Sequence, residues 1–432
     1  MSSGVTRRQF VKASAATLAA TALSSSRVLG ANERVRVGFV GVGNRGGQLI
    51  DALRPHQDAD IVALCDVYGP HLQKWAQECG SSARVFRDFR RMLDLRDLDA
   101  VFVATPDHWH AIQTIDACDA GKDVYIEKPL CMTVKEGRRM VEAARRNDRV
   151  VQVGVQRRSS RMFADLADVV RRGVVGKVTV ARAYRITNMY PSGIGRVADG
   201  EPPDDLDWDM WLGPRPKRPF RANIAPYKFR WWDAYSSQLG NWGVHYFDLL
   251  RWLLDEDAPA SVSCHGGRFA VDDDRTIPDT LQATYQFASG RLLLFGQYEA
   301  SGASPFARNA EVELRGTLGT VFATSSSYEI VPETAGQFGD PKPLPEPARV
   351  KADEGDLTVA HIRDFLDCVK TRQRPRADVE VGHRSSTFSH LGNIALALEA
   401  RVEWDAKRER FTSPNEANKL LHYDYRKPWR LG

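Results

Sequence analysis

Between residues 34 and 155 the sequence alternates short apolar, β-branched runs with amphipathic segments. Apolar runs of this length predict strands that are buried on both faces, and the amphipathic segments predict helices that cover them. We expect strands at 34–42, 60–67, 100–105, 123–127 and 150–155, with helices at 45–53, 72–79, 110–120 and 135–146. The alternation predicts an α/β fold that begins with a doubly wound parallel sheet.

A different pattern follows residue 157. A helix at 162–171 and a strand at 177–185 are expected to precede a long irregular segment, 188–240, that is rich in Pro, Gly and Trp. Further strands are expected at 261–271, 280–287, 291–299, 311–315 and 320–324, and helices at 359–370 and 383–401. This order predicts an α+β domain with a large, mostly antiparallel open sheet.

A glycine-rich turn directly follows the first predicted strand. It reads Gly41-Val42-Gly43-Asn44-Arg45-Gly46 and leads into the first predicted helix. In this strand–turn–helix context, such a turn is typical of a dinucleotide site, where the backbone approaches the pyrophosphate and the helix N-terminus faces it. The residues expected to hold the phosphates are Gly41, Gly43, Asn44, Arg45 and Gly46.

Asp66 ends the second predicted strand and lies 20 residues after Gly46. A carboxylate at this place accepts hydrogen bonds from the adenosine ribose diol and repels a 2′-phosphate. Its neighbours Val67 and Tyr68 supply no cation. We therefore favour NAD over NADP as the cofactor, the alternative being a glycine turn with an incidental acid.

Composition and charge exclude other classes of protein. The chain of 432 residues is 43% hydrophobic and 27% charged, as in ordinary globular proteins, and no apolar stretch is long enough to span a membrane. Four of the five net positive charges come from residues 1–30, so the remainder is nearly neutral and nucleic-acid binding is not expected. The Arg-rich stretch 84–96 is expected to be the solvated face of an amphipathic helix.

The first thirty residues resemble an export signal. Arg7 and Arg8 precede a weakly apolar stretch and then small residues near Gly30, which is the pattern of a Tat-type signal; a frayed basic helix is the alternative. No cysteine lies near the expected cleavage site, so no stable membrane anchor is expected. We expect a periplasmic protein that carries its cofactor through export, because Tat substrates cross the membrane folded.

Neither a disulfide framework nor a metal site is expected. The six cysteines show no C-x-x-C pattern, and His108 and His110 have no evident third ligand.

Several motifs together resemble the glucose–fructose oxidoreductase/inositol dehydrogenase (Gfo/Idh/MocA) family. Besides the glycine turn, these are Ala104-Thr-Pro-Asp-His-Trp-His110, Tyr125-Ile-Glu-Lys-Pro129, Gln152–Arg158, Asp207–Pro214, Gly240–Asp248, Gly382–Ser385 and Gly392–Ile394. The resemblance covers nearly all of the chain after the signal. It implies three segments: the signal at 1–30, an NAD-binding Rossmann domain at 31–156, and a substrate-binding and oligomerisation domain at 157–432 whose last part can pack back on the first domain.

The resemblance also implies roles for individual residues. Lys128 would lie beside the nicotinamide and the substrate, and His245 would transfer a proton. The family has Asp four residues before that histidine, whereas this chain has Asn241, which can orient His245 but cannot stabilise an imidazolium by charge. Further residues expected at the cofactor are Thr105, Pro106, His108 and Glu127, and those expected at the substrate are Gln156 and Arg157.

Five of the ten tryptophans fall within residues 208–242. Indole faces pack against the C–H face of a sugar, and arginine binds its hydroxyls or carboxylates, but tryptophans also anchor long irregular segments. Both interpretations stay open. The members expected at the substrate are Arg230, Trp231, Trp232 and Trp242.

The chemistry of these residues predicts hydride transfer between a sugar carbinol and a tightly bound nicotinamide. A base near neutral pKa and a neighbouring cation suit removal of the hydroxyl proton. A glycosidase, lyase or epimerase that oxidises the sugar transiently is the first alternative, and a non-catalytic sugar-binding protein is the second. The resemblance further implies a homo-oligomer.

Overall fold

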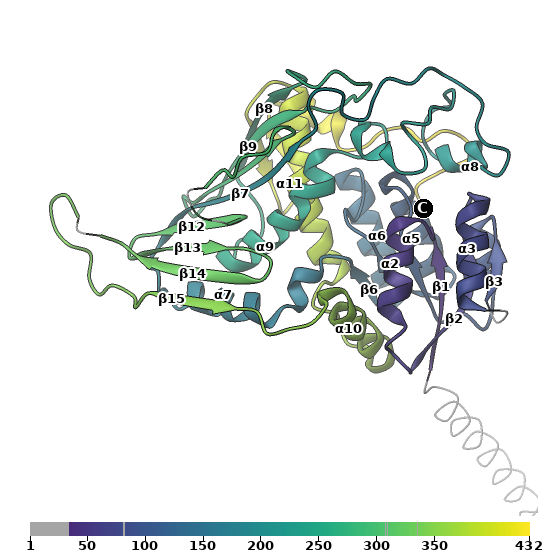
Figure 1. Ribbon diagram of the computed structural model, residues 1–432, viewed down its shortest axis with the longest axis horizontal. Helices are drawn as coiled ribbons and strands as arrows, with labels where there is room; N and C mark the ends of the chain where they lie inside the picture. The colour runs from purple at the N-terminus through teal and green to yellow at the C-terminus, as the bar shows by residue number, and fades with distance from the viewer. Residues whose placement is uncertain (1–33, 81–82, 307, 309, 335) are drawn as a thin grey trace, which may run out of the picture.

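The computed structural model describes residues 34–80, 83–306, 308, 310–334 and 336–432. The expected export signal lies outside these residues. Within them, no helix has both the length and the apolar character needed to cross a membrane. Two sheets with their covering helices make up the molecule, and they lie side by side (Figure 1).

The first sheet is parallel and has the order β3-β2-β1-β4-β5-β6 in the described residues. Its strands are β1 (Val35–Val40), β2 (Ala59–Cys65), β3 (Arg84–Phe86), β4 (Ala100–Val103), β5 (Asp123–Ile126) and β6 (Val151–Val153). Its helices are α2 (Asn44–Leu53), α3 (Gly69–Cys79), α4 (Phe89–Leu93), α5 (His110–Asp119) and α6 (Val134–Arg146). The doubly wound Rossmann arrangement is confirmed.

The second sheet is mostly antiparallel, in the order β15-β14-β13-β12-β7-β10-β9-β8-β16-β17, with β11 pairing β7. The exception is β7 with β10, which run parallel. The strands are β7 (Val178–Asn188), β8 (Ser261–Gly267), β9 (Thr280–Gln286), β10 (Leu292–Tyr298), β11 (Ala300–Ser301), β12 (Val312–Gly316), β13 (Gly319–Ala323), β14 (Ser327–Pro332), β15 (Ala348–Lys351), β16 (Val402–Asp405) and β17 (Arg410–Ser413).

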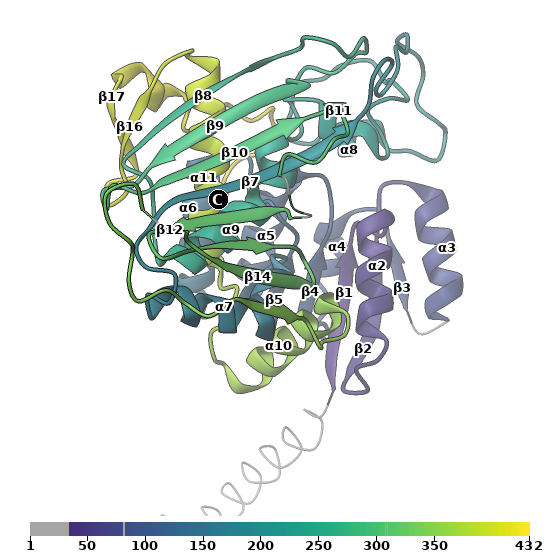
Figure 2. The ribbon, with the colours of Figure 1, turned by 60° about the vertical axis from the view of Figure 1, so that its left-hand side comes forward.

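Helices cover one face of this second sheet (Figure 2). They are α7 (Arg161–Arg171), α9 (Val244–Leu254) and α11 (Val379–Ala397), while α8 (Trp208–Leu212) lies in the irregular segment. The core between sheet and helices is aromatic: Phe247 contacts Tyr285, Phe295 and Phe388. Buried apolar side chains thus fix the helices on the inner face of the sheet.

The chain returns to the Rossmann domain through α10 (Leu357–Thr371). Phe39, Phe102 and Tyr125 stack across three neighbouring strands with ring centroids 4.7 and 5.0 Å apart. Phe365 of α10 meets Phe102 edge-on at 5.5 Å. A helix from the C-terminal part therefore covers one face of the N-terminal sheet.

The Arg-rich stretch 84–96 differs from the expected continuous helix. Its first residues form edge strand β3, and α4 begins only after Asp88, whose carboxylate accepts a hydrogen bond from the Arg90 backbone N–H. Asp88 is the N-cap of a new helix here, because its carboxylate pairs with a backbone N–H that has no partner within the helix.

Candidate functional site

A cleft opens at the carboxyl ends of β1, β2 and β4, beside the glycine turn. Gly41 has φ +83°, and a Cβ there would lie 2.8 Å from the carbonyl carbon of Ala104. A Cβ on Gly46 would lie 2.0 Å from the Gly41 carbonyl oxygen. Only glycine fits these two positions, and α2 begins directly afterwards with its N-terminus at the cleft. This arrangement fits the pyrophosphate of a dinucleotide.

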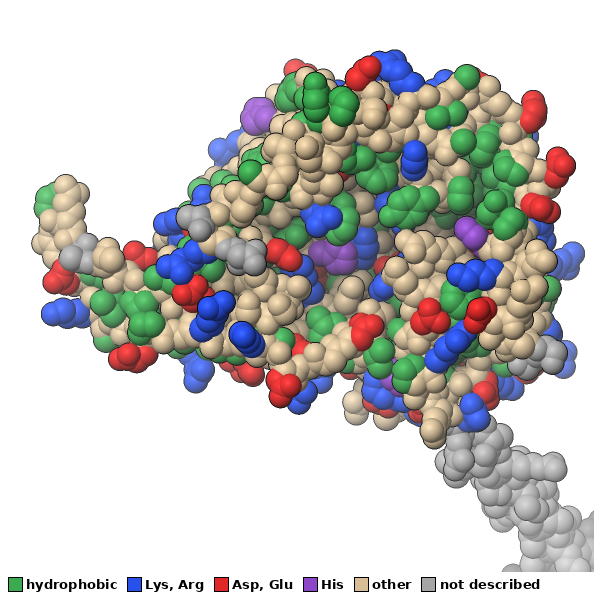
Figure 3. Space-filling model, viewed as in Figure 1, with side chains coloured by type: hydrophobic (Ala, Val, Ile, Leu, Met, Phe, Trp, Pro, Cys, Tyr) green, Lys and Arg blue, Asp and Glu red, His purple; other side chains and the backbone are tan. Residues whose placement is uncertain are grey.

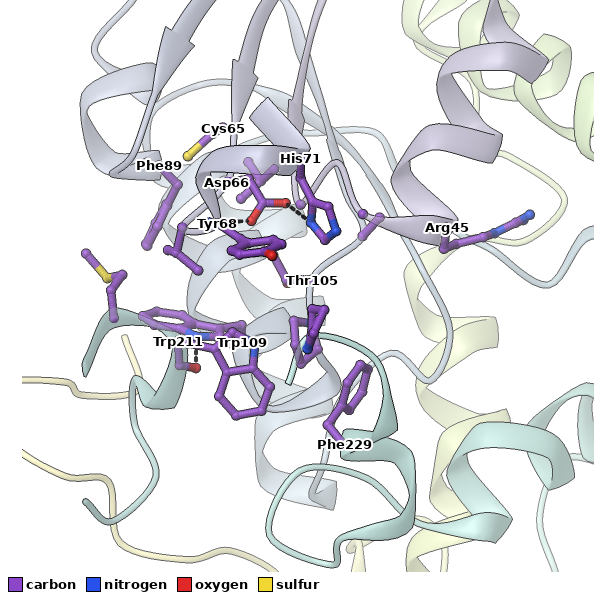
Figure 4. Close-up of a pocket in the computed structure, with 18 of the residues that line it drawn as sticks. Arg45, Cys65, Asp66, Tyr68, His71, Phe89, Thr105, Trp109, Trp211 and Phe229 are labelled. Atoms are coloured by element: carbon purple, nitrogen blue, oxygen red, sulfur yellow. Dashed lines mark hydrogen bonds and ion pairs between the residues drawn. The ribbon is translucent and has the colours of Figure 1, made fainter. Parts of the chain in front are cut away.

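Asp66 forms one end of the cleft. Its carboxylate accepts hydrogen bonds from the backbone N–H groups of Val42 and Tyr68, each at 2.9 Å, and lies 3.4 Å from Nδ1 of His71 (Figure 4). These contacts hold the carboxylate where the ribose diol of an adenosine would lie. Arg87 also lines this end, but its guanidinium donates to the carbonyl oxygens of Val67 and Asp205.

The opposite wall comes from the second domain. Leu206, Trp211, Tyr227 and Phe229 line the cleft, and Figure 4 shows Trp211 and Phe229 facing the wall that carries Asp66. We call residues 205–230 the covering segment. Its start is tied to the Rossmann domain because Gly69 N–H donates to Asp205 (2.9 Å) and Asp207 N–H donates to Val67 (3.0 Å).

Lys128 follows the end of β5 by two residues and lines a second pocket beside the cleft. Its Nζ donates to the backbone oxygen of Asn241 at 2.7 Å and to the side-chain Oδ1 at 3.2 Å. Burial lowers the pKa of Lys128 to about 8, although the negative charges of Glu127 and Asp107 act to raise it. Glu127 itself is engaged by Arg45 Nε at 2.7 Å. The lysine can therefore exchange a proton near neutral pH.

Asn241 belongs to a π-helical turn, Leu239–Gly243, that runs into α9, and His245 follows one helical turn later. Burial and the positive charge of Lys128 lower the pKa of His245 well below its ordinary value. His245 is therefore neutral at physiological pH. The expectation of a base near neutral pKa applies to Lys128 rather than to this histidine.

The second pocket shares Asn44, Arg45, Ala104, Thr105, Tyr227, Phe229 and Arg230 with the cofactor cleft, so the two are continuous. Arg185, Trp231, Trp242 and Glu299 line its far side. Trp231 Nε1 donates to Glu299 at 3.0 Å, and the Arg185 guanidinium lies 3.8 Å from the centre of the Trp242 ring. The pocket has the mixed aromatic and polar lining of a small-molecule site.

Trp232 and His108 lie in the aromatic interior and line neither pocket. Trp232 is only 2% exposed and donates to the carbonyl of Asn223, so it anchors the irregular segment instead of contacting a substrate. His108 is buried with its Nε2 2.9 Å from the carbonyl oxygen of Trp211, and it does not line the cofactor cleft. Burial in the aromatic interior explains both differences, and it lowers the pKa of His108 to about 3.

The other expected residues are divided between the two pockets and their surroundings. Thr105 and Pro106 line the cofactor cleft, while Arg230, Trp231 and Trp242 line the second pocket. Gln156, Arg157 and His245 line neither pocket. The first two lie on a short helix, Gln156–Ser159, where Arg157 pairs with Glu311 at 2.5 Å. Sequence reasoning missed Arg185, Tyr227 and Phe229, for which the sequence offers no motif.

The cysteines are unpaired. All six cysteines lie in the described residues and are free, and five of them are buried. Within the same residues no group of three or more His, Cys, Asp or Glu side chains is placed to hold a metal ion.

The glycine turn, the carboxylate after β2 and the partly buried lysine after β5 define a two-domain oxidoreductase with an NAD-binding fold. A model of the oxidoreductase family's NAD-binding Rossmann fold matches residues 35–155, and a model of its C-terminal alpha/beta domain matches residues 161–431. The chain belongs to the Gfo/Idh/MocA oxidoreductase family.

Similar proteins include dehydrogenases and a glycosidase. Myo-inositol 2-dehydrogenase of Thermotoga maritima is 24% identical over 85% of this chain and 98% of its own length. An alpha-N-acetylgalactosaminidase of Shewanella oneidensis is 27% identical over 42% of each chain. The solved structure of a levoglucosan dehydrogenase with NADH and levoglucosan has a TM-score of 0.66 at 17% identity, covering 86% of this chain and 99% of the other.

Proposed function

We propose that this protein oxidises or reduces a sugar or sugar derivative, with NAD as the resident hydride carrier. The observation that carries the proposal is the position of Lys128: it is partly buried in the second pocket, which is continuous with the cofactor cleft, and its pKa is about 8. Dehydrogenases of the same family, among them the myo-inositol enzyme, support the substrate class.

The chain's own residues suit removal of a hydroxyl proton. When bound, NAD supplies the hydride acceptor. Neutral Lys128 accepts the proton of the carbinol, and Asn241 holds the Lys128 Nζ in place through two oxygen atoms. Neutral His245 offers one ring nitrogen as donor and the other as acceptor, which suits orientation of a second hydroxyl.

We further propose that NAD stays bound through the catalytic cycle. The covering segment supports this because it spans the cleft from the second domain and is tied to Val67 and Gly69 by backbone hydrogen bonds. Export through the Tat pathway to the periplasm, which we also propose, would require affinity near nanomolar, about −12 kcal/mol. A second sugar would then return the cofactor to its starting redox state.

A glycosidase, lyase or epimerase that oxidises its sugar transiently is a second candidate. The partial similarity to an alpha-N-acetylgalactosaminidase supports the same candidate.

Product analysis with the purified holoprotein tests both candidates. A panel of sugars and glycosides is added, and the absorbance of reduced nicotinamide is followed alongside chromatography of the products. Lasting reduction of the bound cofactor supports the oxidoreductase, whereas released free sugar, an unsaturated product or an epimer without lasting reduction supports the second candidate. A protein purified without nucleotide, and inert when NAD is added, contradicts both.

We also propose a homo-oligomer. Figure 2 shows the outer face of the second sheet without covering helices, and alternate side chains of β9 and β10 on this sheet are only half-buried. Light scattering after size exclusion tests this proposal, and a monomer at micromolar concentration would contradict it.

A further inference from the structure

Arg185 is the most unusual cation of the second pocket. It lies on β7, and its guanidinium is stacked on Trp242 with its centre 3.8 Å from the ring centre. Its Nε is buried and has no hydrogen-bond partner among the described residues. A stacked guanidinium loses few rotamers on binding and presents its remaining donors in one plane, the geometry that suits an oxyanion.

No acid neutralises Arg185 within the described residues. The acids that line the pocket have other partners: Glu127 pairs with Arg45, and Glu299 accepts hydrogen bonds from Trp231, Gln238, Gln297 and Arg275. Asp107 accepts one from Ser236, and burial raises its pKa. Arg182, on the same strand, is by contrast paired with Glu313.

Other cations face the same space. Lys128 Nζ lies 5.9 Å from the centre of the Trp242 ring, and Arg230 lines the pocket with its Nη1 on the Tyr227 carbonyl and with no carboxylate paired to it in the described residues. The positive charges of Lys128 and Arg185 both act on His245. Blue side chains and a histidine gather in the hollow between the two halves of the molecule (Figure 3). The site therefore holds an excess of positive charge in a partly enclosed space.

We propose that the sugar bound in this pocket carries an anionic group, a carboxylate or a phosphate, and that Arg185 is its anchor. The inference rests on the proposed function only in taking the ligand to be a sugar, since it needs no redox step. A charge-assisted pair with Arg185 would fix the ring against Trp231 and direct a hydroxyl towards Lys128. Arg185 occupies one face of the Trp242 ring, so that face is closed to a sugar.

Matched sugars test the proposal by binding alone. The probes are D-glucose, D-galactose and D-mannose, their uronic acids and their 6-phosphates, titrated by calorimetry against the holoprotein. We expect at least one acidic sugar to bind at least tenfold more tightly than its neutral counterpart. A preference for the uronic acid assigns a carboxylate, and a preference for the 6-phosphate assigns a phosphate.

Variants then assign the preference to Arg185. Arg185→Met should weaken binding of the acidic sugar about 10- to 100-fold, and by at least tenfold more than it weakens the neutral sugar, at the same NAD content; Arg185→Lys should rescue it in part. Arg349→Met is the matched control, because it removes the same charge from an exposed position on β15 of the same sheet.

Three results would overturn the inference: equal or tighter binding of the neutral sugars, a preference that survives Arg185→Met, or no binding of any acidic probe at millimolar concentration. These results are separable from failure of the proposed function. If a neutral sugar reduces bound NAD, the proposed oxidoreductase function stands and the inferred anionic group is excluded. If an acidic sugar binds but neither reduces NAD nor is converted to a product, the inferred anionic group stands and the proposed oxidoreductase function is excluded.

Discussion

Lys128 Nζ donates hydrogen bonds to two oxygen atoms of one residue, the backbone carbonyl (2.7 Å) and the side-chain amide (3.2 Å) of Asn241. Both acceptors are neutral, so they hold the amine without stabilising its charge as strongly as a carboxylate would. Desolvation of the amine lowers its pKa to about 8, and these neutral acceptors do little to oppose that shift. This pair joins the Rossmann domain to the π-helical turn that precedes α9, in the pocket that is continuous with the cofactor cleft.

Replacing the amine should abolish turnover without removing the cofactor. In Lys128→Met the hydroxyl proton has no acceptor of suitable pKa, so we expect kcat to fall about 100- to 10,000-fold. The NAD content after denaturation should match that of the wild-type protein. Turnover within a factor of two of wild type would exclude Lys128 from proton transfer.

Sugar oxidation should accelerate with rising pH. Burial lowers the Lys128 pKa from 10.5 to about 8, so its neutral, proton-accepting form becomes dominant above that pH. We expect kcat for oxidation to rise through an apparent pKa near 8, and the reverse reduction to fall over the same range. A flat profile between pH 6 and 9 would contradict this assignment.

Asn241→Asp should move that profile. A carboxylate beside Lys128 stabilises the ammonium form and raises its pKa by about 1 unit or more. The rising limb of the rate profile should therefore shift towards higher pH, while the Kd for NAD stays the same. An unchanged limb would show that the lysine is not the titrating group.

The covering segment should control release of NAD. Tyr227 lines both pockets and is 48% exposed, so Tyr227→Ala should open the cleft at little cost to folding. We expect NAD to dissociate about tenfold faster, consistent with the loss of one aromatic contact, as followed by nucleotide lost on dialysis. Tyr190→Ala is the control, since Tyr190 is 62% exposed and lines neither pocket. Equal loss from both variants would contradict a role for Tyr227.

Packing of α10 on the first sheet should contribute strongly to stability. Phe365 is fully buried against Phe102 and Tyr125, so Phe365→Ala should lower the free energy of unfolding by about 3–5 kcal/mol. Phe338→Ala, at a residue that is 96% exposed, should change it by less than about 0.5 kcal/mol. Chemical denaturation measures both. A loss below 1 kcal/mol for Phe365→Ala would mean that α10 is not part of this core.

The N-terminal sheet could be predicted from sequence because each of its central strands is a continuous apolar run between recognisable turns. Val101, Phe102 and Val103, for example, are all buried. Strands β14 to β17 were missed because their exposed faces carry polar residues and their partners are set by long-range pairing. Helix α9 was also missed, although its motif was recognised, because its apolar residues surround the helix instead of forming one stripe.

The candidate site also has residues that could be predicted from the sequence and residues that could not. Residues in local motifs, such as Gly41, Asp66 and Lys128, could be found because the chemistry depends on their local sequence context. Arg185 could not, because its significance comes from stacking on Trp242, which lies on another element. The covering segment likewise has no pattern of its own, and hydrogen bonds between residues far apart in sequence fix its position.

A crystal structure of the protein with NAD tests the central claim most directly. We expect the pyrophosphate to lie on the turn from Gly41 to Arg45, the adenosine ribose to contact Asp66, and the nicotinamide ring to face Lys128. An empty cleft at saturating NAD, or a nicotinamide directed away from Lys128, would contradict the proposed function.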